Sequence, residues 1–187
     1  STVVGAIPEN LIAILKQING FIQFGGGLHF RGVCTTPEWH SLEKIMCGDS
    51  ALHKNYAAVK STDIPFAQDC MGDQYILRDR VVYKLYGETG EFVCMQLTLA
   101  DFFERIQNDP VEFLQMGPLL EFQKGDRSLN PGELLNAYPP FCTKESANGV
   151  SLRALPVDEQ LAFLAAFSRR ISDVESGGSI VVKVVEY

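Results

Sequence analysis

The 187 residues, of which 46% are hydrophobic and 21% charged, predict a soluble folded domain, alone or with an extension, and exclude a disordered or fibrous chain. A net charge of −7 argues against direct binding to nucleic acid and favours a basic partner. No apolar run approaches the roughly 18 residues of a membrane span and no signal pattern opens the chain, so we expect a protein that does not bind a membrane. The five cysteines include no C-x-x-C pair, and we therefore expect a cytoplasmic location.

The N-terminal part predicts two helices separated by a glycine-centred pair of strands. Apolar residues recur at helical spacing over residues 8–18, and Asn-Gly follows as a stop signal. The sequence FIQFGGGLHFRGV at 21–33 alternates apolar and polar residues around three glycines, which is typical of a strand, a tight turn and a second strand. A further helix is predicted to begin at Pro37 and to include Trp39.

The middle of the chain predicts a three-stranded antiparallel meander followed by helices. Its segments are rich in Tyr, Val, Ile and Phe and are separated by two turn signals, Asp-Arg and Gly-Glu-Thr-Gly. The predicted strands are 74–78, 81–86 and 91–96. Thr98 and Asp101 have the spacing of a capping box, so a helix with one apolar face begins there, and Asp109-Pro110 begins another short one.

The C-terminal part predicts loops first and regular elements later. Residues 116–150 are rich in Gly, Pro and Asn, with one helical turn expected at 133–137. A strand at 150–155, a helix at 156–171 and a terminal strand at 179–186 follow. We therefore predict an α+β class with residues 1–107 as the core of the fold and 108–187 as a C-terminal extension that completes the same domain.

The carboxylates clustered between residues 63 and 91 raise the question of a metal or acid–base site. Asp69, Asp73 and Asp79 do not have the closely alternating spacing of a calcium loop, and turn or surface roles are the simplest interpretation. Contact with a partner comes next and a metal last. A glycosidase-like pair of carboxylates would need a facing geometry that a sequence does not show.

Other candidate chemistry is equally weak in the sequence. The candidate zinc ligands Cys34, His40, Cys47 and His53 lack the spacing of common zinc sites. The triple glycine is not followed by the Lys-[ST] of a phosphate-binding loop, and no nucleophile elbow or cysteine-hydrolase signature occurs. We predict no catalytic residue, metal or cofactor, and an enzyme built from scattered Asp, Cys and His residues is kept as a third alternative.

The order of several motifs carries more information than their individual spacing. They are PENLIAILKQINGF, GGGLHFRGV, a segment with Trp39, IPFAQDCMGDQYILR, YGETGE and TLADFFERI. In this order, over about residues 7–107, they resemble the SUKH superfamily, also called Smi/Knr-like. The most specific element is Ile-Pro-Phe-Ala at 64–67 followed by Gly72-Asp73, although the family usually has a link richer in Asn and Gly where this chain has QDCM.

The resemblance implies a curved, mainly antiparallel β-sheet packed against several helices, without an enzymatic centre. It also implies a binding module, since bacterial members of the family that this chain resembles commonly act as cytoplasmic immunity proteins against polymorphic toxins, including nucleases. We expect an immunity protein that binds a basic toxin domain, or alternatively a regulatory or scaffold domain that binds an endogenous protein. The candidate partner-binding residues are Trp39, Phe66, Asp69, Asp73, Asp79, Glu88 and Glu91.

Overall fold

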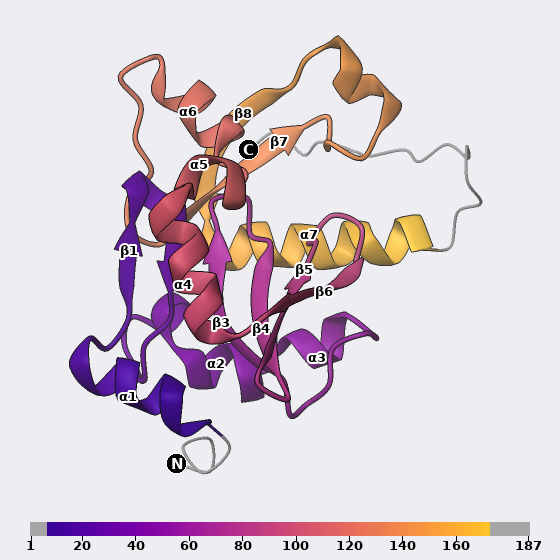
Figure 1. Cartoon of the computed structure of the whole chain (residues 1–187). Helices are drawn as coiled ribbons and strands as arrows, with labels where there is room; N and C mark the ends of the chain where they lie inside the picture. The colour runs from indigo at the N-terminus through magenta and orange to yellow at the C-terminus, as the bar shows by residue number, and fades with distance from the viewer. Residues whose placement is uncertain (1–6, 173–187) are drawn as a thin grey trace.

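The protein has an α+β fold with a six-stranded antiparallel sheet and a separate two-stranded hairpin, in a computed structural model that describes residues 7–172 (Figure 1). The sheet consists of β1 (Phe21–Gln23), β2 (Leu28–Phe30), β3 (Ile64–Asp69), β4 (Gln74–Arg78), β5 (Val81–Leu85) and β6 (Phe92–Leu97). The hairpin consists of β7 (Glu133–Tyr138) and β8 (Ser151–Pro156). The α+β class predicted from the sequence is confirmed.

Each strand of the sheet pairs with the next strand along the chain, so the sheet is one continuous meander. The predicted pairing of β4, β5 and β6 is confirmed. The two-residue turn between β4 and β5 has positive φ at both Asp79 (51°) and Arg80 (69°), the geometry that matches the twist of a hairpin. Successive connections alternate between the two ends of the sheet, so 70–73 and 86–91 lie at one end and 79–80 at the other.

Helices cover both faces of this sheet. In the view of Figure 1, α4 lies in front of the strands, whereas α2 and α7 lie behind them. The helices are α1 (Glu9–Gln17), α2 (Leu42–Cys47), α3 (Leu52–Asn55), α4 (Leu99–Asn108), α5 (Pro110–Phe113), α6 (Gly117–Gln123) and α7 (Val157–Ser172). The predicted capping box is present at the start of α4, where Thr98 and Asp101 each accept a backbone N–H of the other. Within residues 7–172, no helix has the length and apolar character to cross a membrane.

A β-bulge at Phe66 decides which side chains of β3 face which layer. On one side of the bulge Pro65 is opposite Ile76, and on the other Ala67 is opposite Tyr75, so Phe66 is the extra residue. Because paired residues share a face, Ala67 and Tyr75 point to the α4 side, as Phe66 does. Gln68 and Gln74 form the next pair and point to the opposite side, toward α2 and α7.

The hydrophobic core on the α4 side is aromatic. The Phe102 ring of α4 lies 5.2 Å from the Phe66 ring and 4.9 Å from the Tyr75 ring, both in edge-to-face geometry. Phe30 of β2 lies 5.7 Å from Phe66 in the same cluster. Buried residues of the C-terminal part, including Leu135 of β7, belong to this core as well.

The hairpin and α7 are attached to the sheet at the β3–β4 turn. The backbone N–H of Leu135 donates to the carbonyl of Cys70 at 2.7 Å, and the Gln160 amide donates to the carbonyl of Met71 at 3.1 Å. The turn needs a glycine at position 72, because φ is +95° there and a Cβ would lie 2.9 Å from Leu164 of α7. This contact places α7 directly against the turn.

Several predicted elements differ from the structure. The segment 64–69, to which no element was assigned, is a paired strand, and residues 117–123 form a helix that was not predicted. The helix expected from Pro37 onward is divided at Ser41 into a short 3₁₀ turn (Glu38–His40) and α2. Residues 133–137 form β7 instead of a helical turn because they pair with β8, and the strand predicted at 179–186 lies outside the described residues.

A buried ion pair closes the other end of the sheet. Arg78 at the end of β4 donates from Nε and from a terminal nitrogen to the two carboxylate oxygens of Asp63, at 2.8 and 2.6 Å. Asp63 is 3% exposed and also accepts the backbone N–H of Lys60 at 2.7 Å. Bidentate pairing of this kind fixes both side chains, and the loss of one partner leaves the other without its charge partner.

We predict that Asp63→Ala lowers the free energy of unfolding by about 3 kcal/mol, since it removes one partner of this pair and leaves the Arg78 guanidinium partly buried. Urea denaturation followed by circular dichroism measures this change. Glu38→Ala is the matched control, because it breaks the exposed Lys44–Glu38 pair and should have little effect. Equal effects of the two substitutions would contradict the assignment.

Candidate functional site

One end of the sheet brings four of the predicted interface carboxylates together. Asp69 ends β3 and Asp73 lies in the β3–β4 connection, whereas Glu88 and Glu91 come from the β5–β6 connection at the same end. All four line one cavity of about 440 Å³, which we call the acidic pocket. Its other lining residues are Met71, Tyr86, Thr89, Gln115, Pro118, Phe141, Cys142 and Leu164. No lysine or arginine of residues 7–172 is among them.

The floor of the acidic pocket is a buried triad in which two carboxylates share one ammonium group. The Lys84 Nζ lies 3.1 Å from an oxygen of Asp69 and 3.3 Å from an oxygen of Asp73. It also donates to Gln115 at 2.7 Å. Asp69 accepts the backbone N–H groups of Met71 and Asp73 at 3.0 and 3.1 Å, which holds its charge in place.

Burial and mutual repulsion shift the ionisation of this triad. Burial, followed by the negative charge of Asp69, raises the pKa of Asp73 to about 7, although Lys84 and the backbone N–H of Gly87 oppose the shift. Burial alone would lower the pKa of Lys84, but the two carboxylates and Tyr75 raise it above its ordinary value. Lys84 is therefore always charged at neutral pH, whereas Asp73 changes its charge there.

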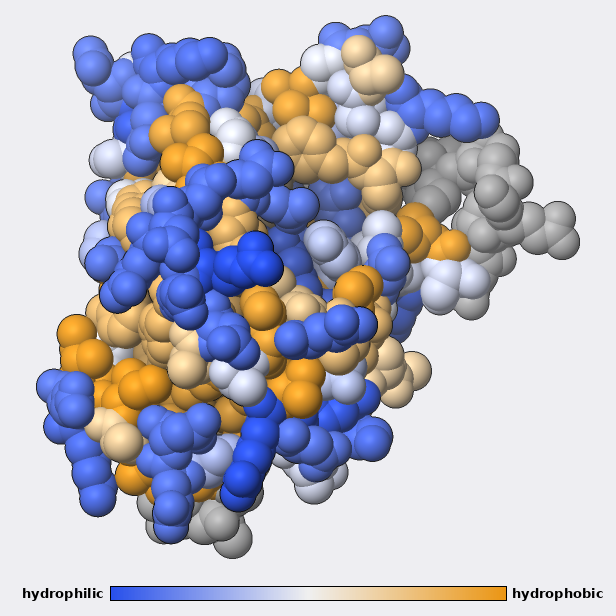
Figure 2. Space-filling model, in the orientation of Figure 1, coloured by the Kyte–Doolittle hydropathy of each residue, from blue (hydrophilic) through white to orange (hydrophobic). Residues whose placement is uncertain are grey.

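The rim of the acidic pocket combines carboxylates with apolar surface. Glu88 accepts the backbone N–H groups of Phe141 and Cys142 at 3.1 and 3.0 Å, so it holds the loop after β7 against the sheet. Phe141 is 43% exposed and Pro118 lines the same cavity. Figure 2 shows apolar side chains gathered above a hollow on this face. Glu91 is exposed and lines the same cavity.

Three of the predicted interface residues lie outside this site, and one inside it is less exposed than expected. The expectation that Phe66 anchors a partner is wrong, because its side chain is 0% exposed and packs under α4. The expected exposure of Asp69 is also wrong, since it is 2% exposed and bound to Lys84. Asp79 is exposed but lies at the other end of the sheet, and Trp39 is half-buried on the α2 side.

Sequence reasoning missed a second buried polar cluster, on the α2 side, which consists of His29, Arg31, Gln68 and Gln74. Arg31, which is 1% exposed, donates to Gln68 at 2.5 Å and to Gln74 at 2.7 Å. Gln68 lies 3.1 Å from His29 Nδ1, and His29 Nε2 lies 2.8 Å from His40 Nδ1. The only signal in the sequence was that Arg31 is a charged residue within a predicted apolar strand. Lys84 of β5 gave the same signal.

This polar chain has one consistent direction of donation. The carbonyl of Asn19 only accepts, so His40 donates to it from Nε2 at 3.3 Å and accepts at Nδ1. His29 therefore donates from Nε2 to His40 and accepts at Nδ1 from the Gln68 amide. Gln68 is thereby held with its oxygen toward Arg31. A proton on His29 Nδ1 would face the Gln68 N–H group, so His29 fits best when neutral.

No group of three or more His, Cys, Asp and Glu side chains in the described part of the chain is arranged to hold a metal ion. In the acidic pocket Lys84 already occupies the position between the two buried carboxylates. The arrangement can therefore receive a cationic or hydrogen-bond-donating group at its rim, next to apolar surface, without a metal at its floor.

We predict that Asp69→Asn lowers the pKa of Asp73 by about one pH unit or more, because the repelling charge is lost and Lys84 is left with one carboxylate. The carboxyl ¹³C shift of Asp73, followed by NMR from pH 4 to 9, measures this pKa. Glu91→Gln is the control and should leave it near its wild-type value. An unchanged Asp73 titration in Asp69→Asn would show that burial alone sets the pKa.

A second prediction concerns His29, whose pKa burial, Arg31 and His40 lower to about 2. The unfolded chain binds a proton below its ordinary pKa of about 6.5 and the folded chain does not, so this residue makes the protein less stable as pH falls below about 6.5. His29→Gln should remove up to about 1.4 kcal/mol per pH unit from the slope between pH 6 and 4.

Urea denaturation of wild type and His29→Gln at matched pH values measures this difference in slope. The raised pKa of Asp73 acts in the opposite direction, since the folded protein holds a proton that the unfolded chain releases between pH 4 and 7. The comparison is therefore best made in an Asp73→Asn background. Parallel pH profiles of the two variants would show that His29 is protonated in the folded protein.

Comparison with known proteins identifies no relative of this chain. No protein-family model, no curated protein and no solved structure matches it. The resemblance to the SUKH superfamily therefore depends on the sequence motifs alone, and the evidence for function comes from the geometry of the two polar sites.

Proposed function

We propose that this protein is a non-enzymatic binding domain of the SUKH type, which captures a basic residue of a partner protein in the acidic pocket. One observation supports this function above the others: four carboxylates line the pocket, and Lys84 is the only cation of residues 7–172 that pairs with Asp69 and Asp73. The pocket therefore keeps negative charge that a cationic side chain would neutralise. Among the possible partners, a basic toxin domain that this protein neutralises in the cytoplasm fits best.

The shape of the pocket supports a lysine or arginine side chain as its occupant. Long basic side chains have an apolar stem and a charged head, and they pack the stem on apolar surface while the head finds polar partners. Phe141 and Pro118 offer such surface in the lining of the pocket, and Glu91 and Asp73 offer carboxylates in the same lining. The net charge of −7 would also speed the approach of a basic partner at low salt.

The experiment starts with affinity capture of the tagged protein from its own cells at low salt, followed by mass spectrometry. Recovery of a basic toxin domain in stoichiometric amounts supports neutralisation, whereas recovery of a cellular signalling protein supports the regulatory or scaffold alternative. The captured partner is then used in surface plasmon resonance with variants of the acidic pocket.

We predict that Asp73→Asn weakens binding of this partner about tenfold or more, mainly through faster dissociation, because the partner's cation loses a largely buried carboxylate. Glu91→Lys should slow association at low salt. Wild-type binding should weaken below pH 7 as Asp73 takes up a proton, and Asp73→Asn should lose this pH dependence.

Asp79→Lys is the matched control for Glu91→Lys, since it makes the same charge change on an exposed residue at the opposite end of the sheet. It should bind the partner as wild type does. If both reversals weaken binding equally, only the overall charge matters. If neither does, the partner binds elsewhere and the acidic pocket has another role.

A further inference from the structure

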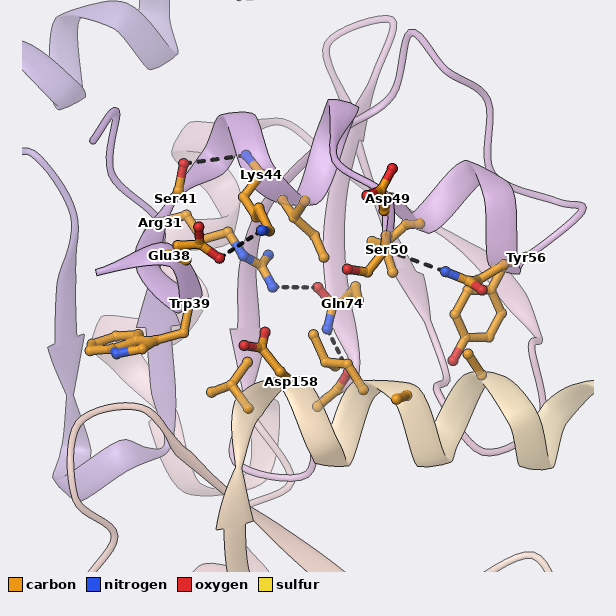
Figure 3. A pocket seen from close by; sticks show the side chains of 18 of the residues that line it. Arg31, Glu38, Trp39, Ser41, Lys44, Asp49, Ser50, Tyr56, Gln74 and Asp158 are labelled. Carbon is orange, nitrogen blue, oxygen red and sulfur yellow. Dashed lines mark hydrogen bonds and ion pairs between the residues drawn. The ribbon is translucent and has the colours of Figure 1, made fainter. Parts of the chain in front are cut away.

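A second cavity, of about 380 Å³, lies on the opposite side of the sheet between α2 and α7. We call it the Arg31 pocket. Figure 3 shows Arg31 reaching from the sheet toward Gln74 in the middle of this cavity, with Trp39 and Asp158 to one side and Tyr56 to the other. Its apolar wall comes from Ile45, Leu52, Val157, Leu161, Ala162 and Ala165. None of these residues lines the acidic pocket.

The Arg31 guanidinium is buried without a charge partner in the described part of the chain. Its three hydrogen bonds go to neutral oxygens, the carbonyl of Pro65 at 2.8 Å and the side-chain carbonyls of Gln68 and Gln74. No carboxylate of residues 7–172 forms an ion pair with it. Since a guanidinium has five N–H donors, two have no acceptor among these residues.

A buried cation without a charge partner is unfavourable for the stability of the fold, so its presence in the Arg31 pocket needs another explanation. Taking a charged side chain out of water costs several kcal/mol unless an opposite charge compensates it. Burial accordingly lowers the pKa of Arg31 to about 9. A neutral side chain that bridges the same strands would avoid this cost, so the charge is better explained by a ligand than by stability alone.

The other charges of the pocket limit the ligand to a single negative charge. Lys44 at the mouth is already paired with Glu38 at 2.6 Å. Asp49 and Asp158 are exposed at the same mouth, with Arg169 as the remaining basic residue. A dianionic phosphate would be repelled by these acids, whereas a carboxylate neutralises one charge and can accept from the two N–H donors that remain, one on Nε and one on Nη1.

We propose that the Arg31 pocket binds a small organic carboxylate, with the carboxylate on Arg31 and an apolar body against the wall formed by α2 and α7. The direction of the polar chain supports this assignment, since neutral His29 keeps the Gln68 oxygen on Arg31 and leaves the charge uncompensated. The volume suits a molecule of metabolite size. This site is independent of the acidic pocket and of the partner proposed for it.

The test is an NMR titration of the full-length ¹⁵N-labelled protein that follows the Nε–H signal of Arg31, assigned with Arg31→Lys. The probes are acetate, benzoate, inorganic phosphate and chloride at matched ionic strength. We expect a saturable shift with acetate and a tighter one with benzoate, which adds apolar contact, and none with chloride. A shift that grows linearly and equally in all four salts would overturn the proposal.

Phosphate binding more tightly than benzoate would also overturn the assignment of a carboxylate. Arg31→Lys keeps the charge but loses the Nε–H donor and the fixed donor geometry of the guanidinium, so it should weaken benzoate binding about tenfold or more. Because a core variant can fail to fold, Ala162→Trp provides a second test: Ala162 is exposed on α7 and lines the cavity, so the bulky ring should block it.

Glu159→Trp is the control for Ala162→Trp, since it places the same ring on the same helix at an exposed position that does not line the cavity. It removes a negative charge, so it cannot weaken binding of an anion through charge. Retained benzoate binding in Glu159→Trp and its loss in Ala162→Trp would support the proposal. Full binding in Ala162→Trp would place the ligand elsewhere.

Discussion

The single-residue bulge at Phe66 is the constraint on which both sites depend. Without it, the side chains of β3 would alternate regularly, and Phe66 and Gln68 would face the same layer. With it, Phe66 fills the aromatic core under α4, whereas Gln68 turns to the other side and meets Arg31. The proline that precedes the bulge also fits this place, because its carbonyl accepts from Arg31 and a bulge tolerates its missing N–H group.

The same strand carries a charged residue to the opposite face. Asp69 lies in register with Leu28 on the α4 side, where it meets Lys84 of β5. Lys84 and Arg31 are the two buried Lys or Arg side chains of residues 7–172. They lie on opposite faces of the sheet, and their environments differ. Lys84 has two carboxylates and an excess of negative charge around it, whereas Arg31 has only neutral oxygens. This difference is the basis for proposing a cationic ligand at one site and an anionic ligand at the other, although both sites are built on β3 and β4.

The sequence predicted the elements whose patterns are local. The capping box of α4, the helix predicted at 156–171 and the turn at Asp79-Arg80 depend on neighbouring residues, and all three were found. β3 was missed because all six of its residues are buried, which removes the alternation that marks a strand. β7 was mistaken for a helical turn because Glu, Leu and Ala favour helices, and its pairing with β8 overrides that preference.

The sites were harder to predict because they depend on the topology of the sheet. Once 74–96 is a meander, the connections at 70–73 and 86–91 must share one end, which groups Asp73 with Glu88 and separates Asp79. The sign of the net charge in each pocket depends on how Lys84 and Arg31 are paired. A single charged residue in a strand does not indicate which residues it pairs with. Asp73 and Gln74 are consecutive yet face different cavities, so the turn held by Gly72 and α7 fixes the geometry of both. A displacement of this turn would change the acidic pocket and the Arg31 pocket together, because it would move the backbone that carries both side chains.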